Sequence, residues 1–440
     1  MRCILGLVVV LVGLSASAAL PFDGEVDSSF GNGGQVALTR PSDQGGHGSR
    51  PTGDLAMLPD GRFLWAAPMD DGSVWVGRML ANGSPDALGG HGDGRITVPA
   101  CGDSRNVMLL DDGAEGAIVW ASNCLVHVRG DGSVDTTFGA GNMPPHGFRA
   151  AGLARDSAGR FVLAGKEGAE LAIYRFDAQG VLDPGFGIDG RVEVVVPTTN
   201  GTADLYALVL RPDRRILVGG SRGNVFGPSL IVAQYTEAGA LDPSWSGDGI
   251  VDIAPRPGDD LLYATAMALD ADGSLVVSGI GSSGDSNCCR MLMRLDSSGE
   301  VVPSFGIRLF MLSGMGSIFP FFEQRDGLAL LPNRRIQIGA ISFPIAAPFT
   351  HRTRFTLIRT FSDGSIDTAF GHNGWNSFTI VDPESAGQSG DYDQMHAMAY
   401  TGSGLVMLGR TFFEDNSTGN GYVTMVRAKL DLIFDHAFDD

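Results

Sequence analysis

Residues 180–187 read GVLDPGFG, and their pattern, G-x-x-D-x-x-F-G, decides the fold because it returns along the whole chain. Complete copies stand at residues 24–31, 132–139 and 364–371. Degenerate copies begin at Gly83, Gly239 and Gly299, and a last copy without the glycine covers residues 432–438. The copies at residues 24 and 432 are 408 residues and seven steps apart, so the period averages about 58 residues. A fixed period of this kind predicts a repeat architecture.

Each period contains the same short apolar runs. A first run ends in a polar turn, as in LAMLPDG at 55–61, and a second starts directly after that turn, as in RILVG at 215–219. A third run precedes the signature, as in LAIYRF at 171–176, and a fourth follows it, as in RVEV at 191–194. Runs bounded by such turns predict strands in hairpins. Four antiparallel strands in each of seven units predict an all-β fold, a seven-bladed β-propeller.

The two ends of the chain predict how the ring closes. The chain begins with a fourth-run segment at 35–38 and ends with a third-run segment at 422–426. We expect these N- and C-terminal strands to complete one blade together, which removes the free sheet edge. The alternative is a linear β-solenoid, although solenoid coils are usually shorter than this period.

The conserved positions of the signature predict scaffold roles. An aspartate that opens a four-residue turn, with proline next in 183–184 and 242–243, fits a type I turn whose carboxylate accepts backbone N–H groups. We expect the aromatic residue of each copy to be buried between neighbouring sheets: Phe30, Phe138, Phe186, Trp245, Phe305, Phe370 and Phe438.

The combination of a P-D-G-R hairpin, as at 59–62, with the signature about two strands later resembles the delta-60 repeat. This is a β-propeller repeat of unknown function found in exported bacterial proteins. The resemblance covers essentially all of residues 24–438. It implies a propeller and export, and it implies no particular reaction.

Residues 1–18 are predicted to be a secretory signal peptide, and residues 19–440 a single propeller domain. Arg2 precedes an apolar run at 4–14, and an A-x-A cleavage site ends at Ala18. The alternative is a membrane anchor, but this run is too short to cross a bilayer, and we expect no membrane span. The mature protein is therefore expected to be exported, with the periplasm, the cell surface and the medium as possible destinations.

The overall charge limits the partners. The chain has 50 acidic and 31 basic residues, a formal net charge of −19, and no basic block, which excludes a nucleic-acid partner. It contains no zinc-protease motif and no phosphate loop. We expect a monomer.

Export into an oxidising compartment makes disulfides possible for the cysteines that follow the signal peptide. Cys101 and Cys124 flank one predicted strand pair and are candidates for a local disulfide. Cys288 and Cys289 are adjacent, and they form either a vicinal disulfide or two unbridged thiols. The spacing alone leaves all three pairings of the four residues open.

Long polar segments are predicted to gather on one face of the ring, here called the long-loop face, and binding residues often lie on such segments. They are residues 39–53, 220–228, 278–287, 344–353, 382–395 and 411–421. Acidic residues recur just before the innermost strands, and with one histidine they are candidate ligand-binding residues at the channel mouth: Asp54, Asp103, Asp204, Asp260, Asp326, Asp393 and His396. They would attract calcium or a cationic ligand. The alternative is that they are solvated or bind loop backbone.

These observations favour an exported, non-enzymatic propeller that binds a protein, peptide or glycan with its long-loop face. The first alternative is a hydrolase or lyase at the channel mouth, with or without a metal, in which His47, His351 or His396 acts beside the acidic residues. A second alternative is a structural spacer at the cell surface.

Overall fold

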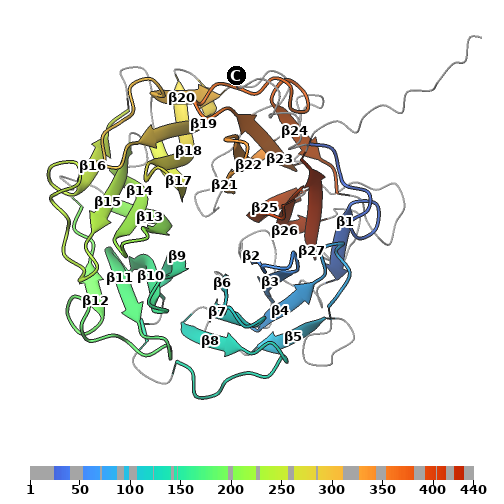
Figure 1. Cartoon of the computed structure of the whole chain (residues 1–440), viewed down its shortest axis with the longest axis horizontal. Coiled ribbons are helices and arrows are strands. Elements are labelled where there is room, and N and C mark those ends of the chain that lie inside the picture. The colour runs from blue at the N-terminus through green and yellow to red at the C-terminus, as the bar shows by residue number, and fades with distance from the viewer. Residues whose placement is uncertain are drawn as a thin grey trace, which may run out of the picture.

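The computed structural model describes residues 24–39, 53–69, 72–86, 94–98, 107–121, 123–139, 143–145, 147–196, 202–223, 228–255, 262–283, 286–310, 327–342, 353–380, 392–402, 404–412 and 421–430. These residues form strands and turns and no helix. The strands make seven antiparallel sheets arranged around a central axis (Figure 1). The predicted seven-bladed β-propeller is confirmed.

The first three blades come from the N-terminal half of the chain. Blade 1 consists of β2 (Asp54–Met57), β3 (Phe63–Pro68), β4 (Val74–Met79) and β5 (Arg95–Val98). Blade 2 has β6 (Val107–Asp111), β7 (Ala117–Ala121) and β8 (Cys124–Val128), which are its three strands among the described residues. Blade 3 has β9 (Arg149–Arg155), β10 (Phe161–Glu167), β11 (Glu170–Phe176) and β12 (Arg191–Glu193).

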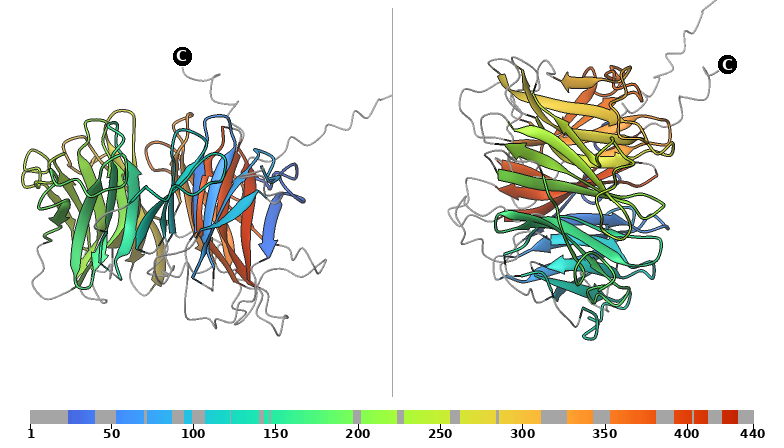
Figure 2. Two further views of the ribbon diagram at one scale, coloured as in Figure 1. Left: turned by 90° about the horizontal axis from the view of Figure 1, so that it is seen from below. Right: turned by 90° about the vertical axis from the view of Figure 1, so that its left-hand side faces the viewer.

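Three further blades follow in the same strand order. Blade 4 has β13 (Thr202–Leu210), β14 (Ile216–Gly223), β15 (Ser229–Tyr235) and β16 (Ile250–Ile253). Blade 5 has β17 (Leu262–Leu269), β18 (Leu275–Ser283), β19 (Ser286–Leu295) and β20 (Ile307–Phe310). Blade 6 has β21 (Leu328–Leu330), β22 (Ile336–Ser342), β23 (Arg354–Thr360) and β24 (Trp375–Phe378). The first strand of each blade lies nearest the axis, and the side views in Figure 2 show the strands running roughly along it.

Blade 7 is built from both ends of the chain. It contains β25 (Tyr392–Tyr400), β26 (Gly404–Phe412) and β27 (Gly421–Lys429), and its outermost strand is β1 (Gln35–Thr39). The pairing of β1 with β27 is antiparallel and places Gln35 opposite Val426 and Thr39 opposite Tyr422. The predicted closure by the N- and C-terminal strands is confirmed, and β27 has no free edge.

The signature binds an arginine of the third strand, which the sequence analysis did not foresee. In blade 3, Gly185 N–H donates to Asp183 Oδ1 over 2.9 Å, as expected for the turn, and Arg175 Nε donates to Asp183 Oδ2 over 2.8 Å. The guanidinium of Arg175 also donates to the carbonyl of Glu237 in blade 4 and lies 4.6 Å from the ring centre of Phe186. One arginine therefore joins the turn, the aromatic residue and the next blade.

The same constellation repeats around the ring. The corresponding pairs are Arg78 with Asp86, Arg359 with Asp367 and Arg427 with Asp27, and in blade 4 Gln234 binds Asp242. The aromatic residues Phe30, Phe186, Trp245, Phe305 and Phe370 are buried and Phe138 is partly buried, as predicted, whereas Phe438 lies outside the described residues. Burial of rings this large makes the blade interfaces a major part of the core.

Candidate functional site

Innermost strands begin at the long-loop face, and this end of the ring holds the candidate site. Most of the segments predicted to form long loops fall outside the described residues: 40–52, 224–227, 284–285, 343–352, 381–391 and 413–420. Part of the prediction was wrong, because β14, β18 and β19 continue through residues 220–223, 278–283 and 286–287. In blade 7, β25 already begins at Tyr392 and therefore contains Asp393, and β26 continues to Phe412. Antiparallel pairing satisfies the backbone of these polar stretches, so they extend the blades.

Four innermost strands carry a β-bulge near this end. The pairing skips one residue in each, namely Ala151 in β9, Tyr206 in β13, Thr265 in β17 and His396 in β25. A bulge leaves the extra residue unpaired and redirects its side chain. The bulges therefore decide which side chains the first residues of these innermost strands present.

A glycine of the second strand accompanies three of these bulges. An added Cβ at Gly165, Gly220 or Gly279 would lie 2.2, 1.9 or 1.7 Å from a backbone carbonyl oxygen of the innermost strand. Those oxygens belong to Arg149, Asp204 and Tyr263, each of which stands two residues before the bulged residue. Only glycine permits this close approach.

Asp54 and Asp204 each bridge to a neighbouring blade. Asp54 Oδ2 accepts the N–H of Leu109 in blade 2 over 2.9 Å. Asp204 Oδ1 accepts from Lys166 Nζ of blade 3 over 2.7 Å. Asp54 matches the alternative reading, a carboxylate that binds backbone, whereas Asp204 keeps 35% of its side chain exposed and remains a candidate for ligand binding.

Asp393 is buried inside blade 7. Its side chain accepts from Thr411 Oγ1 over 2.9 Å, and its N–H donates to Thr353 Oγ1 over 2.7 Å. The three described carboxylates also stand at different registers, with Asp54 opposite Ala66, Asp204 opposite Ser221 and Asp393 opposite Thr411. Asp103, Asp260 and Asp326 lie outside the described residues.

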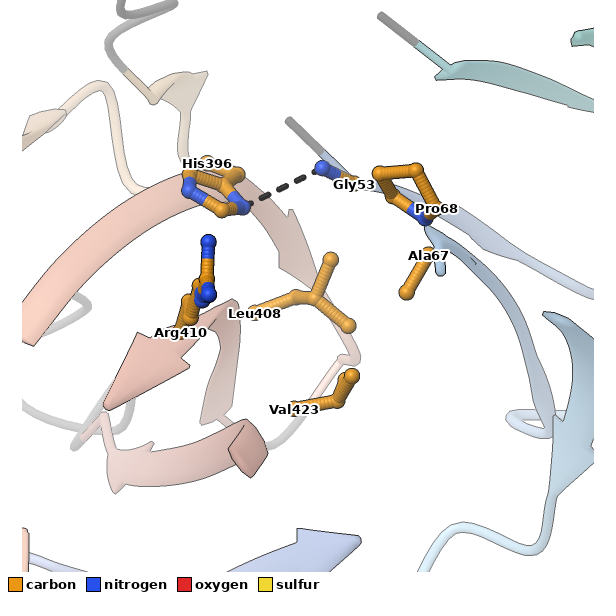
Figure 3. Close-up of a pocket in the computed structure, with 8 residues that line it drawn as sticks. Gly53, Ala67, Pro68, His396, Leu408, Arg410 and Val423 are labelled. Atoms are coloured by element: carbon orange, nitrogen blue, oxygen red, sulfur yellow. Dashed lines mark hydrogen bonds between the residues drawn. The ribbon is translucent and has the colours of Figure 1, made fainter. Parts of the chain in front are cut away.

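His396 lies in a small pocket at the seam between blades 7 and 1. Gly53 N–H donates to its Nδ1 over 3.1 Å, a bond between blades, and the histidine is 5% exposed. Figure 3 shows Arg410 beside the imidazole and the apolar side chains of Leu408 and Val423 below it. The accepting role of Nδ1 requires that this nitrogen carries no proton.

A mixed aromatic and charged cluster on blades 3 to 5 was missed by the sequence analysis. Tyr206 and Tyr263 form an edge-to-face pair with ring centres 6.4 Å apart. The Lys166–Asp204 pair lies beside them, and Arg149 is exposed at the start of β9. Burial raises the pKa of the Tyr206 phenol and the charge of Asp204 adds to this, so the hydroxyl is neutral at physiological pH.

In the sequence, the residues of this cluster are identified by their position in the repeat, because their residue types differ. Arg149, Asp204 and Tyr263 each stand two residues before a bulge on three successive blades, so they share one register. Residue type alone grouped Asp204 with Asp54 and Asp393, which stand at other registers. A search for any side chain at one position of the repeat would have found it.

Three of the four candidate disulfide cysteines, Cys124, Cys288 and Cys289, lie in described strands. Cys124 is disulfide-bonded. Cys101, its predicted partner, lies outside the described residues, so the pairing remains a prediction. Cys288 and Cys289 lie in β19, with Cys289 opposite Gly281, and the state of their thiols is likewise untested.

Two features are absent from the part of the chain that the structure describes. No group of three or more His, Cys, Asp and Glu side chains among them could hold a metal ion. No helix among them is long and apolar enough to cross a membrane.

Among solved structures, the chain is similar to the BP39L lectin from Burkholderia pseudomallei. The TM-score is 0.54 at 12% identity, over 86% of this chain and 96% of the lectin. A puromycin-hydrolysing peptidase from Mycobacterium tuberculosis gives a TM-score of 0.46 at 14% identity, over 87% of this chain and 52% of the peptidase. A GH43 endo-arabinanase from Bacillus licheniformis gives 0.34 at 12% identity, over 62% and 91%. At these identities the likeness concerns the fold alone.

No family model and no curated protein matches the chain. The propeller architecture is therefore shown by the structure, while membership of the delta-60 repeat family stays a prediction.

Proposed function

We propose that this protein is an exported, non-enzymatic β-propeller that binds a protein, peptide or glycan ligand with its long-loop face. The observation that carries the proposal is the shared register of Arg149, Asp204 and Tyr263 on three successive blades, where the buried Tyr263 supports the partly exposed Tyr206. Rigid strands hold these side chains, and rigid support is what a binding site needs.

A glycan is the ligand class that this cluster suits best. A tyrosine offers an apolar ring together with a hydroxyl, and such amphipathic side chains are typical of binding surfaces. The carboxylate of Asp204 accepts hydrogen bonds, and the cations Lys166 and Arg149 donate them. Together they match the alternating apolar and hydroxyl surfaces of a sugar. The lectin with a similar fold makes glycans the first ligands to test.

The enzymatic alternative has less support in the described residues. His396, the one candidate histidine among them, is 5% exposed, and its Nδ1 accepts the N–H of Gly53. It therefore holds two blades together. His47 and His351 lie outside the described residues.

The experiment is a screen of the mature protein against an array of neutral and acidic oligosaccharides, followed by titration of the best binder. We expect Tyr206→Ala to raise the Kd at least tenfold. The matched control is Tyr400→Ala, since Tyr400 is also half-buried on an innermost strand but lies at its other end. If no array glycan binds, or if both variants bind as the parent does, the proposed glycan site is wrong.

A further inference from the structure

Blade 7 takes its signature copy from the other end of the chain. Asp27 N–H donates to Arg427 O, Gly24 N–H donates to Lys429 O, and Lys429 N–H donates to Glu25 O, each over 2.8 Å. Farther along the copy, Gly31 N–H donates to the carbonyl of Asn82 in blade 1 over 2.7 Å. We call the surface that receives this copy, formed by residues 427–429 of β27 and residues 81–82 of blade 1, the closing seat.

In other blades the equivalent seat is filled by the copy that directly follows the third strand. Asp183 stands eight residues after Arg175, and Asp367 stands eight residues after Arg359. In blade 7 the partner of Arg427 is Asp27, 400 positions away in the sequence. The residue eight positions after Arg427 is Asp435.

The C-terminal copy, residues 432–438, has the two side chains that the seat recognises. Asp435 and Phe438 have the same spacing as Asp183 and Phe186 in blade 3. The chain therefore encodes two copies for one seat. The C-terminal copy has the shorter connection, because it follows directly on β27, which ends at Lys429.

The N-terminal copy fits the seat better at its first position. Gly24 has a φ of +91°, and a Cβ there would lie 2.4 Å from the Phe370 ring. The C-terminal copy has Leu432 at the corresponding place. A positive φ is unfavourable for a residue with a Cβ, and the ring of Phe370 would also have to move. This accounts for the choice of Gly24 over Leu432 when both copies are present.

We propose that residues 432–438 are a second occupant of the closing seat, which dock there in the same molecule whenever the N-terminal copy is absent or weakened. Asp435 then pairs with Arg427, and Phe438 fills the space of Phe30. The closing seat is thus an interaction surface with two alternative partners inside one chain, and strand β1 can stay paired with β27 while the copies exchange.

The first experiment empties the seat with Asp27→Ala/Phe30→Ala and reports on it with Phe438→Trp. The seat of blade 4 already accepts an indole, since Trp245 stands at the equivalent position and is 1% exposed. Each spectrum is taken as the difference from the same background without Phe438→Trp. We expect an indole emission that is blue-shifted and protected from acrylamide in the emptied background, and quenched in the parent background. Equal quenching in both backgrounds would overturn the proposal.

The second experiment tests whether docking stabilises the molecule. Asp435→Ala/Phe438→Ala should lower the Tm of the emptied variant by several degrees and leave the Tm of the parent unchanged. The matched control, Asp439→Ala/Asp440→Ala, removes charge from the same segment and should change neither. An equal effect in both backgrounds would contradict the exchange, and a dimer of the emptied variant by size exclusion would show docking between molecules instead.

A third variant decides the question if the emptied protein does not fold. Leu432→Gly improves the C-terminal copy in an otherwise unchanged chain. We expect it to protect an indole introduced by Phe438→Trp and to speed hydrogen exchange of residues 24–31. No change in either signal would overturn the proposal.

Discussion

Two carboxylates of the signature, Asp86 and Asp27, have pKa values lowered by the hydrogen bonds and charges around them. Burial by itself would raise the pKa of Asp86, but hydrogen bonds from Arg62 and Arg78 and their charges lower it below its usual value. Burial would likewise raise the pKa of Asp27, but hydrogen bonds from Ser29 and Arg427 and the charge of Arg427 lower it. A carboxyl whose pKa is lower in the folded state stabilises the fold above its unfolded pKa.

Acid should therefore weaken the propeller through these residues. The folded state binds fewer protons than the unfolded state once the pH drops below about 4, the ordinary aspartate pKa. We expect the free energy of unfolding by urea to fall steadily from pH 4 to pH 2. Asp27→Asn should make this slope shallower, whereas Asp248→Asn, on an exposed turn, should leave it as in the parent. Equal slopes in all three proteins would contradict the assignment.

Removing one of these carboxylates should be costly where the pair is buried. Arg359 Nε donates to Asp367 Oδ2 over 2.8 Å, and the two side chains are 5% and 3% exposed. An unpaired buried charge typically costs about 3–5 kcal/mol. We expect Asp367→Ala to lower the free energy of unfolding by about that much, measured by urea denaturation. Asp363→Ala, in the exposed turn just before the same copy, is the control, and a similar loss there would refute the role of the pair.

Of the side chains that meet at each signature, the sequence predicted the aspartate and the aromatic residue but not the arginine. Asp183 and Phe186 were identified by their spacing, because a turn fixes both within four residues. Arg175 was missed because its contact with Asp183 depends on the pairing of the third strand with the signature, and the side chain then reaches the carbonyl of Glu237 in the next blade. The eight-residue spacing between this arginine and the aspartate recurs in the sequence and would have identified the pair, whereas the contact with Glu237 has no such local pattern.

Each innermost strand works as a unit with the second strand of its blade. Gly279 allows the carbonyl of Tyr263 to approach, and the bulge at Thr265 follows two residues later. The sequence predicted both strands but not the bulge. A one-residue change of register turns every later side chain to the other face. This is why a channel-mouth ring of aspartates was expected, whereas Asp54, Asp204 and Asp393 stand at three registers.

A methyl group opposite the bulge should disrupt this unit. We expect Gly279→Ala to destabilise the protein by about 2 kcal/mol or more, since an added Cβ would lie 1.7 Å from a backbone oxygen and overpacking typically costs 1–3 kcal/mol. The control is Gly185→Ala, whose nearest neighbour is the Asp183 side chain at 3.2 Å. Thermal unfolding of both variants measures the difference. Equal melting temperatures would show that the backbone at Gly279 adjusts freely.

For the whole molecule, ring closure is the feature that the sequence predicted most fully. The segments at 35–38 and 422–426 were matched to fourth and third strands by their place in the repeat, and they pair as β1 and β27. The docking of residues 24–31 on the same blade was not foreseen, because the repeat itself offers a nearer copy at 432–438.

Loss of the N-terminal strand should therefore affect the entire ring. A chain without residues 19–38 leaves β27 with an open edge, and such edges recruit other chains. We expect this truncation to aggregate or to lose cooperative unfolding, as followed by light scattering and calorimetry. A solenoid would lose a terminal coil and keep most of its stability.

The most direct test of the closed propeller is a cross-link between its two ends. Ala37 of β1 and Thr424 of β27 face each other, so Ala37→Cys/Thr424→Cys should form a disulfide inside one molecule under mild oxidation. We expect peptide mapping to find residues 37 and 424 linked in a monomer, with a raised Tm that reductant reverses. The single variant Ala37→Cys controls for pairing with native cysteines. Free thiols at both positions in the oxidised, folded protein, or links formed only between molecules, would contradict the closed ring.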